Sequence, residues 1–247
     1  MTPAPFKNVY LLFTSLLVLM VSLPVAFSTP KSFEFTPIKK SEFSPVIAKS
    51  SFLKIYDSLK LDHSGLSQAA FNYAVKGYEY LKAKGKLVNE NVLTIADFTK
   101  PSSQKRLFIL DLKNYKVLFN TYVSHGQGSG AAMAIKFSNI PESYQSSLGF
   151  YTTSSTYSGK NGFSLHLQGM EAGINDKAEE RAIVMHGAPY VSESFINSRG
   201  FLGRSWGCPA VPEQLSKPII EKIKNGSCLF IYSENNKYLN ASRIINS

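Results

Sequence analysis

The stretch Met185–Pro212, MHGAPYVSESFINSRGFLGRSWGCPAVP, holds one of the two cysteines and one of the four histidines of the chain. A thiol and an imidazole are the minimum equipment for nucleophilic acyl transfer, because the base raises the thiolate fraction and the thiolate attacks a carbonyl. Cys208 is therefore the candidate nucleophile, and His186 is the candidate base.

The neighbours of both residues fit this chemistry. Gly207 permits an unusual backbone conformation just before the nucleophile, and the N–H groups of Gly207 and Cys208 are available to a developing oxyanion. His186 follows the strand-like run 182–185, which predicts a rigid strand end, and Gly187 adds backbone freedom behind it.

Composition sets outer bounds on fold and function. The 247 residues are 44% hydrophobic, with 17 Phe and 13 Tyr, which predicts a packed core in one large domain or two small ones. A net charge of +10 favours anionic surroundings, namely nucleic acid, anionic lipid or an acidic wall polymer. The basic residues form no dense cluster, so we expect no nucleic-acid partner. We also expect no metal, since spacings such as HExxH and CxxC are missing from the sequence.

The N-terminus carries an export signal. Lys7 precedes the nearly uninterrupted apolar run 9–21, Pro24 breaks it, and residues 26–28 place small side chains where a signal peptidase reads. Residues 1–28 are thus predicted to be a signal peptide. The alternative is a retained N-terminal anchor, since the apolar segment approaches the ~20 residues that span a bilayer. Either form places the rest of the chain in the periplasm or cell envelope, with membrane contact only through an uncleaved N-terminus.

Two cysteines in an exported protein raise the alternative of a Cys208–Cys228 disulfide. Cys228 begins the apolar run Cys228–Tyr232, which is typical of a buried strand, and a free Cys there behaves as a small hydrophobe. Cys208 follows a glycine in a polar loop, where a reactive thiol fits better. We therefore favour two free thiols.

The rest of the chain falls into segments. Residues 29–45 lack any period and predict a linker, whereas residues 46–88 predict a helical pair whose second helix is capped by Ser67. Residues 89–235 predict a mainly β catalytic domain, and residues 236–247 a C-terminal tail. The predicted strands are 92–98, 107–112, 117–123, 150–157, 163–168, 181–185 and 228–232, with a hairpin turn at 159–162 and a short helix at 218–224.

His186 together with Ser205-Trp206-Gly207-Cys208 resembles the catalytic motif of the murein L,D-transpeptidases, in which a His precedes [Ser/Thr]-x-Gly-Cys. The similarity covers residues 50–235. It includes the blocks 94–98, 123–126, 137–139, 146–150, 167–171 and 203–210. Trp206 stands where many members have a His, so the third catalytic partner stays open.

This resemblance implies an L,D-transpeptidase-type β-sandwich or barrel that acts on peptidoglycan stem peptides without a cofactor. Cys208 would form an acyl-enzyme with a tetrapeptide stem, release D-Ala and transfer the acyl group to an amine. With water as acceptor the reaction would instead be L,D-carboxypeptidase trimming, and a catalytically silent wall-binding module is a further alternative. We expect a monomer.

Further site candidates follow from position. Ser205 is expected to hydrogen-bond around the nucleophile, and Arg204 to meet a stem carboxylate, which Arg binds bidentately. His125 opens the glycine-rich loop 125–130, which lacks the GK[ST] ending of a phosphate-binding loop. The residues expected to contact substrate are Gly187, Arg204, Trp206, Tyr190 and His125.

Overall fold

A computed structural model of the chain describes residue 52 and residues 54–247. The predicted signal segment 1–28 and the linker 29–45 lie outside the described residues. Within the described range, every helix is too short or too polar to cross a bilayer.

Eight strands form one mixed sheet in the order β3-β2-β1-β8-β4-β5-β6-β7. The β1–β8 and β6–β7 pairs are parallel, and the other neighbouring pairs are antiparallel. The strands are β1 (Val92–Asp97), β2 (Leu107–Asp111), β3 (Lys116–Thr121), β4 (Gly149–Gly159), β5 (Gly162–Gly169), β6 (Val184–Ala188), β7 (Ala210–Pro212) and β8 (Cys228–Tyr232).

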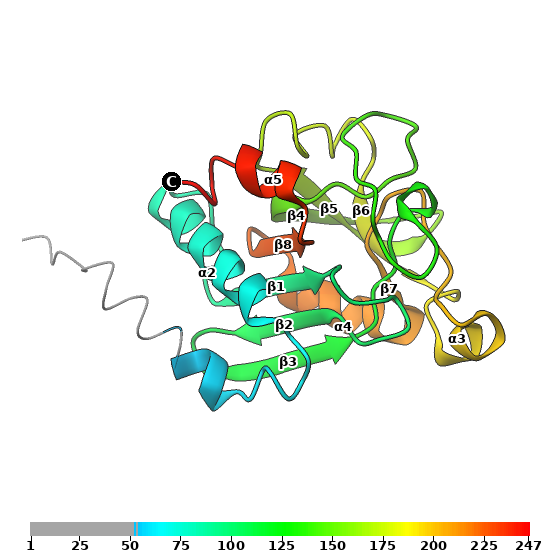
Figure 1. Cartoon of the computed structure of the whole chain (residues 1–247), viewed down its shortest axis with the longest axis horizontal. Coiled ribbons are helices and arrows are strands. Elements are labelled where there is room, and N and C mark those ends of the chain that lie inside the picture. Colours follow the sequence, from blue (N-terminus) through cyan, green and yellow to red (C-terminus); the bar gives the residue numbers. More distant parts are fainter. Residues whose placement is uncertain (1–51, 53) are drawn as a thin grey trace, which may run out of the picture. The chain divides into compact units, whose positions relative to one another are not determined.

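The two edges of the sheet nearly meet. Ser124, three residues after the end of β3, forms an antiparallel bridge with Ala210 of β7, and its N–H donates to the Ala210 carbonyl at 2.8 Å. Gly126 forms a second, parallel bridge with Ser205. The curled sheet therefore brings the glycine-rich loop after β3 against the segment that leads to Cys208 (Figure 1).

Two helices pack on opposite faces of the sheet. In α2 (Gln68–Ala83), Gly77 leaves the space that the Phe150 ring fills, because a Cβ there would lie 2.0 Å from the ring. In α4 (Glu213–Ile223), the carbonyl of Ile223 accepts a hydrogen bond from Thr153. Phe150 and Thr153 are an odd number of residues apart on β4, so their side chains point to opposite faces. The remaining helices are α3 (Glu193–Arg199), α5 (Asn236–Ala241) and the 3₁₀ turn η1 (Gln127–Ser129).

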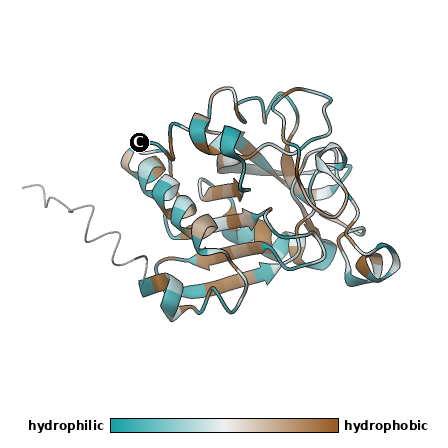
Figure 2. Cartoon of the chain, in the orientation of Figure 1, coloured by the Kyte–Doolittle hydropathy of each residue, from teal (hydrophilic) through white to brown (hydrophobic). Residues whose placement is uncertain are grey.

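Aromatic and β-branched residues form the core between α2 and the sheet. The rings of Phe150 and Phe230 stack at 4.1 Å, and both side chains are fully buried. Figure 2 shows hydrophobic residues concentrated on the strands, whereas α2 also carries hydrophilic residues. Burying one such ring contributes ~2–3 kcal/mol, so this layer fixes the position of the strands that carry the site.

The mainly β fold is confirmed, and most predicted strands lie within a few residues of those observed. The two-residue hairpin turn between Gly159 and Gly162 is also confirmed, as is the buried strand that begins at Cys228. Of the helical pair, α2 begins after the predicted N-cap Ser67, and residues 54–58 are helical. Both cysteines are free.

Three boundaries differ from the predictions. The strand predicted at 181–185 is β6, Val184–Ala188, because Ala182 has φ +51° and closes a series of turns instead of extending. The helix predicted at 218–224 starts at Glu213, because Leu215 and Ser216 already pack against the domain and Pro218 is accommodated within the helix.

The C-terminal segment also differs from the expected tail. Residues 236–241 form α5, and Ile244 and Ile245 are buried against the domain. Ser242 and Tyr238 both donate to the buried Glu171 carboxylate. Residues 236–247 thus contribute to the core.

Candidate active site

Cys208 lies two residues before β7, where its sulfur meets the edge of β6. The Val184 N–H donates to Sγ at 3.5 Å, and the thiol donates to the Ala182 carbonyl at 3.7 Å. Val184 is the first residue of β6, and Ala182 lies two residues before it. The thiol therefore occupies the position that a longer β7 would fill.

His186 lies on β6, two residues after Val184. It pairs with Ala210 in the parallel β6–β7 ladder, so the two residues that precede Ala210 place Cys208 level with Val184. Residues two apart on a strand share a face and lie ~7 Å apart. The register therefore places His186 and Cys208 close to one another at the start of the β6–β7 pair. His186 lies in the middle of this strand, where we had predicted the strand end.

One tautomer of His186 is favoured by its backbone partner. Its Nδ1 lies 2.9 Å from the carbonyl oxygen of Gly187, an acceptor, so Nδ1 carries the proton and Nε2 keeps its lone pair. A Cβ on Gly187 would lie 2.7 Å from Ser216 of α4. This tight packing holds the carbonyl in place, so a main-chain oxygen orients the imidazole.

Both candidate catalytic groups are electrically neutral at rest. Burial lowers the pKa of His186 below 6.5, although the Gly187 carbonyl opposes that shift. Burial also raises the pKa of Cys208 above 9.0, against smaller opposing effects of the Val184 N–H and the Arg181 charge. At pH 7 the site therefore holds a thiol and a neutral imidazole, which is the arrangement for general-base activation.

The segment before Cys208 is held by its own hydrogen bonds. Ser205 Oγ accepts from the Gly207 N–H at 3.1 Å and donates to the Cys208 carbonyl at 2.6 Å. Ser205 is thus a residue that shapes the loop, and the Gly207 N–H that we expected in an oxyanion hole is engaged at rest. Gly207 has φ +126°, a conformation that side chains rarely tolerate.

A long connection between β3 and β4 packs over this segment. Ser146 Oγ accepts from the Gly126 N–H at 3.0 Å and donates to the Gly207 carbonyl at 3.1 Å, which links three loops. The Tyr144 carbonyl lies so close to Gly126 that a Cβ there would be 2.3 Å away. The glycine-rich loop and the β3–β4 connection therefore form one rigid frame around Cys208.

Arg181 is the functional residue that sequence reasoning missed. Its guanidinium donates to the Ser138 and Gln145 carbonyls and to the Ser147 and Ser143 hydroxyls. It also lies beside Gly207, and its charge lowers the pKa of the thiol. We had included Arg181 in a strand, and an arginine next to a strand gives no sequence signal for contacts with residues so far away in the chain.

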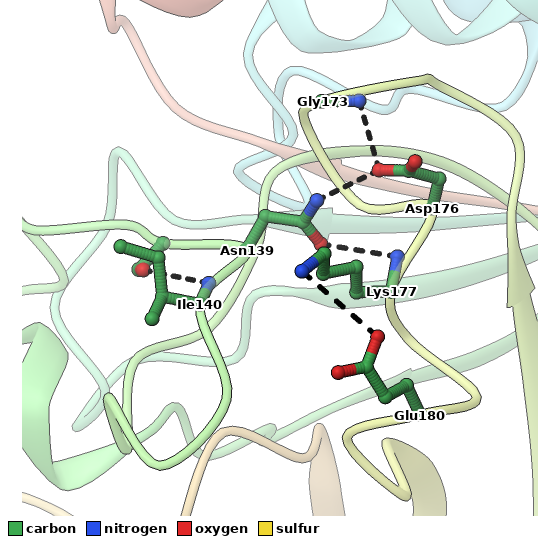
Figure 3. Close-up of polar contacts among 7 residues, drawn as sticks. Asn139, Ile140, Gly173, Asp176, Lys177 and Glu180 are labelled. Carbon is green, nitrogen blue, oxygen red and sulfur yellow. Dashed lines mark hydrogen bonds and ion pairs between the residues drawn. The ribbon is translucent and has the colours of Figure 1, made fainter.

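A second anchor lies on the same connection. The Asn139 amide donates to Asp176 at 2.7 Å and accepts from the Lys177 N–H at 3.2 Å, while Asp176 also accepts from the Gly173 N–H (Figure 3). The β3–β4 connection is thus held against residues 173–181 at two places.

His125 does not contact substrate in this arrangement, which corrects our expectation. It is fully buried, and its Nδ1 accepts from the buried Arg106 at 2.8 Å while Nε2 faces the Gly130 carbonyl. Burial and the Arg106 charge lower the pKa of His125 to about 4. Its own carbonyl accepts from the Ser205 N–H, so His125 supports the segment before Cys208.

The other predicted substrate contacts lie around the thiol. Burial, and then the charge of Cys208, raise the pKa of Tyr190 to about 12. Arg204 is exposed and donates to the Gly130 carbonyl at 3.1 Å. Trp206 is 70% exposed, with its ring 5.6 Å from that of Tyr144.

A cleft of about 410 Å³ lies beside the start of β6, and Cys208 and His186 are not part of its lining. Its lining includes Ala182 and Val184, whose backbone binds Cys208, together with the stacked rings of Tyr157 and His166. His166 pairs with Val184 across β5 and β6, so its side chain is on the face that carries His186. This cleft is therefore the candidate groove for a peptide that reaches Cys208.

Metal ligation finds no support in the part of the chain that the structure describes, where acidic, His and Cys side chains form no group of three or more.

A family profile described as the L,D-transpeptidase catalytic domain matches residues 62–232, more than half of the chain. The chain belongs to the L,D-transpeptidase catalytic domain family. No curated protein matches its sequence.

Similar solved structures include an L,D-transpeptidase from Mycobacterium smegmatis, with 13% identity over 58% of this chain and 59% of that chain and a TM-score of 0.36. They also include L,D-transpeptidase 3 from Mycobacterium tuberculosis with a faropenem-derived adduct, with 12% identity, coverage of 58% and 60%, and a TM-score of 0.38. This chain spans about three fifths of the length of these chains.

Proposed function

We propose that this protein is an exported, cysteine-dependent L,D-transpeptidase of peptidoglycan. Cys208 attacks the carbonyl of the third residue of a tetrapeptide stem and forms a C–S bond. The amide bond to the terminal D-Ala then breaks. The thioester is next attacked by the amine of a second stem, which forms the cross-link and returns the thiol.

The observation that supports this proposal is that His186, oriented by the Gly187 carbonyl, pairs in β6 with Ala210, two residues after Cys208. The Gly187 carbonyl holds Nδ1–H, so Nε2 is free to accept the thiol proton and later to deliver it to the leaving amine. A cysteine peptidase of another fold would orient this imidazole with an Asn or Asp side chain, but here a main-chain carbonyl contacts Nδ1.

The thiol has to leave its resting contacts before it reacts. Sγ is held between the Ala182 carbonyl and the Val184 N–H, so a rotation about the Cα–Cβ bond of Cys208 is needed to bring it to His186. The Cys208 N–H belongs to the same residue as the nucleophile, so it lies near the substrate carbonyl whose oxygen becomes the oxyanion. This N–H is a better placed oxyanion donor than that of Gly207, which Ser205 engages.

The surrounding residues have proposed roles in substrate binding. The cleft beside Val184 receives the donor stem, and Tyr190 closes the site near the sulfur. Arg204 is exposed at the rim and meets a stem carboxylate. The positive charge of the chain favours its retention at an anionic wall polymer after export.

The test is to incubate the purified protein with a disaccharide-tetrapeptide and to weigh the products. A cross-linked dimer supports transpeptidation. A tripeptide alone supports the second candidate, L,D-carboxypeptidase trimming, which the solvent-accessible side of Cys208 favours. Unchanged substrate, equal to that with Cys208→Ala, would leave only a silent wall-binding module.

Thiol reactivity supplies an independent test. A carbapenem should add its mass to the wild-type protein at Cys208 and add nothing to Cys208→Ala. His186→Ala should keep the fold and lose most of this acylation, whereas an unfolded variant would assign His186 a structural role.

Export has its own test. The N-terminal sequence of the protein recovered from the cell envelope should begin near Thr29 if residues 1–28 are a cleaved signal. An intact Met1 would instead support the anchor, and recovery from the cytoplasm would contradict export.

A further inference from the structure

Trp206 is an exposed aromatic residue at the rim of the candidate site. It stands two residues before Cys208, and 70% of its surface is open to solvent. Its ring packs at 5.6 Å and 57° against Tyr144, which is 42% exposed. Two large rings that contribute little to the core and share one rim next to a nucleophile mark a binding surface.

The backbone conformation of Tyr144 supports the interpretation of the two rings as a binding surface. Tyr144 has φ +53°, a conformation that bulky residues rarely adopt and that glycine or asparagine would adopt more easily. Such a conformation persists only where the surroundings impose it, and it is concentrated at functional sites. The chain therefore retains a tyrosine where the backbone alone favours a smaller residue.

Hydrogen bonds to the backbone hold the segment that carries Tyr144. Arg181 binds the Gln145 carbonyl next to Tyr144, and Asn139 binds Asp176 on the same connection (Figure 3). The backbone around Trp206 is also held, because Ser205 Oγ accepts a hydrogen bond from the Gly207 N–H. The two rings are thus positioned before any ligand arrives, which lowers the entropic cost of binding.

The positive charge near Trp206 distinguishes between the two kinds of ligand that exposed aromatic rings bind. Exposed aromatic faces attract cations, or they pack against the C–H faces of neutral rings. Arg204 is exposed two residues before Trp206, Arg181 lies beside Gly207, and the chain has a net charge of +10. A cationic ligand is disfavoured here, whereas a neutral sugar ring is not.

We propose that Trp206 and Tyr144 form a sugar-binding subsite for the glycan that carries the donor stem. This rests on the proposed function, because the stem peptides of peptidoglycan are attached to a neutral amino-sugar strand. The protein would then act preferentially on stems still joined to glycan, and poorly on free stem peptides.

Trp206 is the only tryptophan of the chain, so its fluorescence reports on this subsite directly. Full-length Cys208→Ala protein should show a saturable change in emission with disaccharide-tetrapeptide and with the disaccharide alone, and none with free tetrapeptide at equal concentration. An unchanged emission with both sugar-containing probes would overturn the subsite, whether or not the protein is an enzyme.

Enzyme kinetics provide a second test of the proposed subsite. Trp206→Ala should lower kcat/KM for disaccharide-tetrapeptide ~10-fold, mainly through KM, and lower that for free tetrapeptide much less, since one aromatic stacking contact has about this strength. Trp206→Phe should restore part of the loss. Tyr115→Ala is the matched control, because Tyr115 is also exposed with φ +51° but lies in the β2–β3 turn.

Equal losses for both substrates would instead assign Trp206 to the shape of the Cys208 segment and would overturn the proposal. If wild type converts neither substrate, the proposed transpeptidase function fails, and the fluorescence titration still decides the sugar subsite.

Discussion

Substitution of Gly207 by alanine should disable the site by displacing Cys208. Gly207 has φ +126°, and a Cβ there would lie 2.9 Å from the Gln145 carbonyl and 3.1 Å from Ile183. The backbone strain of a side chain in such a conformation costs ~1–3 kcal/mol. The carbonyl cannot easily give way, because Arg181 binds it at 2.6 Å.

Strain and contact together should lower the free energy of unfolding by ~3 kcal/mol, which corresponds to a fall in Tm of ~6–12 °C for a domain of this size. A shift of ~1 Å in a reacting atom costs ~100-fold in rate. Acylation of Gly207→Ala by a carbapenem, followed by intact-protein mass, should therefore slow by about that factor relative to wild type.

Gly162→Ala is the matched control. Gly162 also has a left-handed backbone, with φ +71°, but a Cβ there would meet nothing within 4 Å. Its substitution should lower Tm by only ~2–4 °C and leave acylation unchanged. Wild-type acylation in Gly207→Ala, or an equal loss of rate in Gly162→Ala, would refute the reasoning.

Four further outcomes are expected. His186→Gln should slow carbapenem acylation ~10²–10⁴-fold with Tm nearly unchanged, since it removes only the proton acceptor; a wild-type rate would mean another base. The acylation rate should stay constant as the pH falls from 7 to 6.5 and should decline only below pH 6.5, where His186 with its lowered pKa becomes protonated. Above pH 9 the rate should increase as the thiol ionises. A midpoint of the acid decline above pH 6.5 would contradict a buried neutral imidazole. Arg181→Met should cost ~2–4 kcal/mol of stability and slow acylation, because it leaves the Ser138 and Gln145 carbonyls without their charged donor; unchanged denaturant curves would show that the β3–β4 connection is held by other contacts. Cys228→Ala should lower stability ~1–2 kcal/mol and leave acylation intact, since its side chain is fully buried in β8, and wild type should keep its mass on reduction; a 2 Da gain would show a disulfide.

The parts of the fold that could be predicted are those encoded by local patterns. The strand at Cys228–Tyr232 is an unbroken run of buried residues, so its bounds follow from the sequence. The start of β6 does not, because the turn at Ala182 depends on hydrogen bonds from residues 171–181 to one another. The start of α4 depends on the packing of Leu215 and Ser216 against the domain, which local helix signals do not contain.

The same division holds for the candidate site. The candidate pair Cys208 and His186 followed from residue type and a recognised motif, and in the structure His186 pairs with Ala210, two residues after Cys208. The acceptor for His186 could not be found, because it is the main-chain oxygen of Gly187 and every residue has one. His125 was misjudged because a histidine in a glycine-rich loop looks accessible, whereas the buried Arg106 draws it inward.

The resting state of Cys208 has a consequence for the proposed exported enzyme. A thiolate is the form that oxidants attack, and compartments outside the cytoplasm are oxidising. Burial raises the pKa of Cys208, and the thiol donates a hydrogen bond to the Ala182 carbonyl, so the sulfur stays protonated while the site is empty. In the proposed mechanism a neutral His186 removes the thiol proton as the sulfur attacks the substrate carbonyl. An arrangement with a preformed thiolate and imidazolium would react faster at rest, but it would expose the nucleophile to oxidation between turnovers. The neutral pair is therefore the form of this site that best survives where its substrate is found.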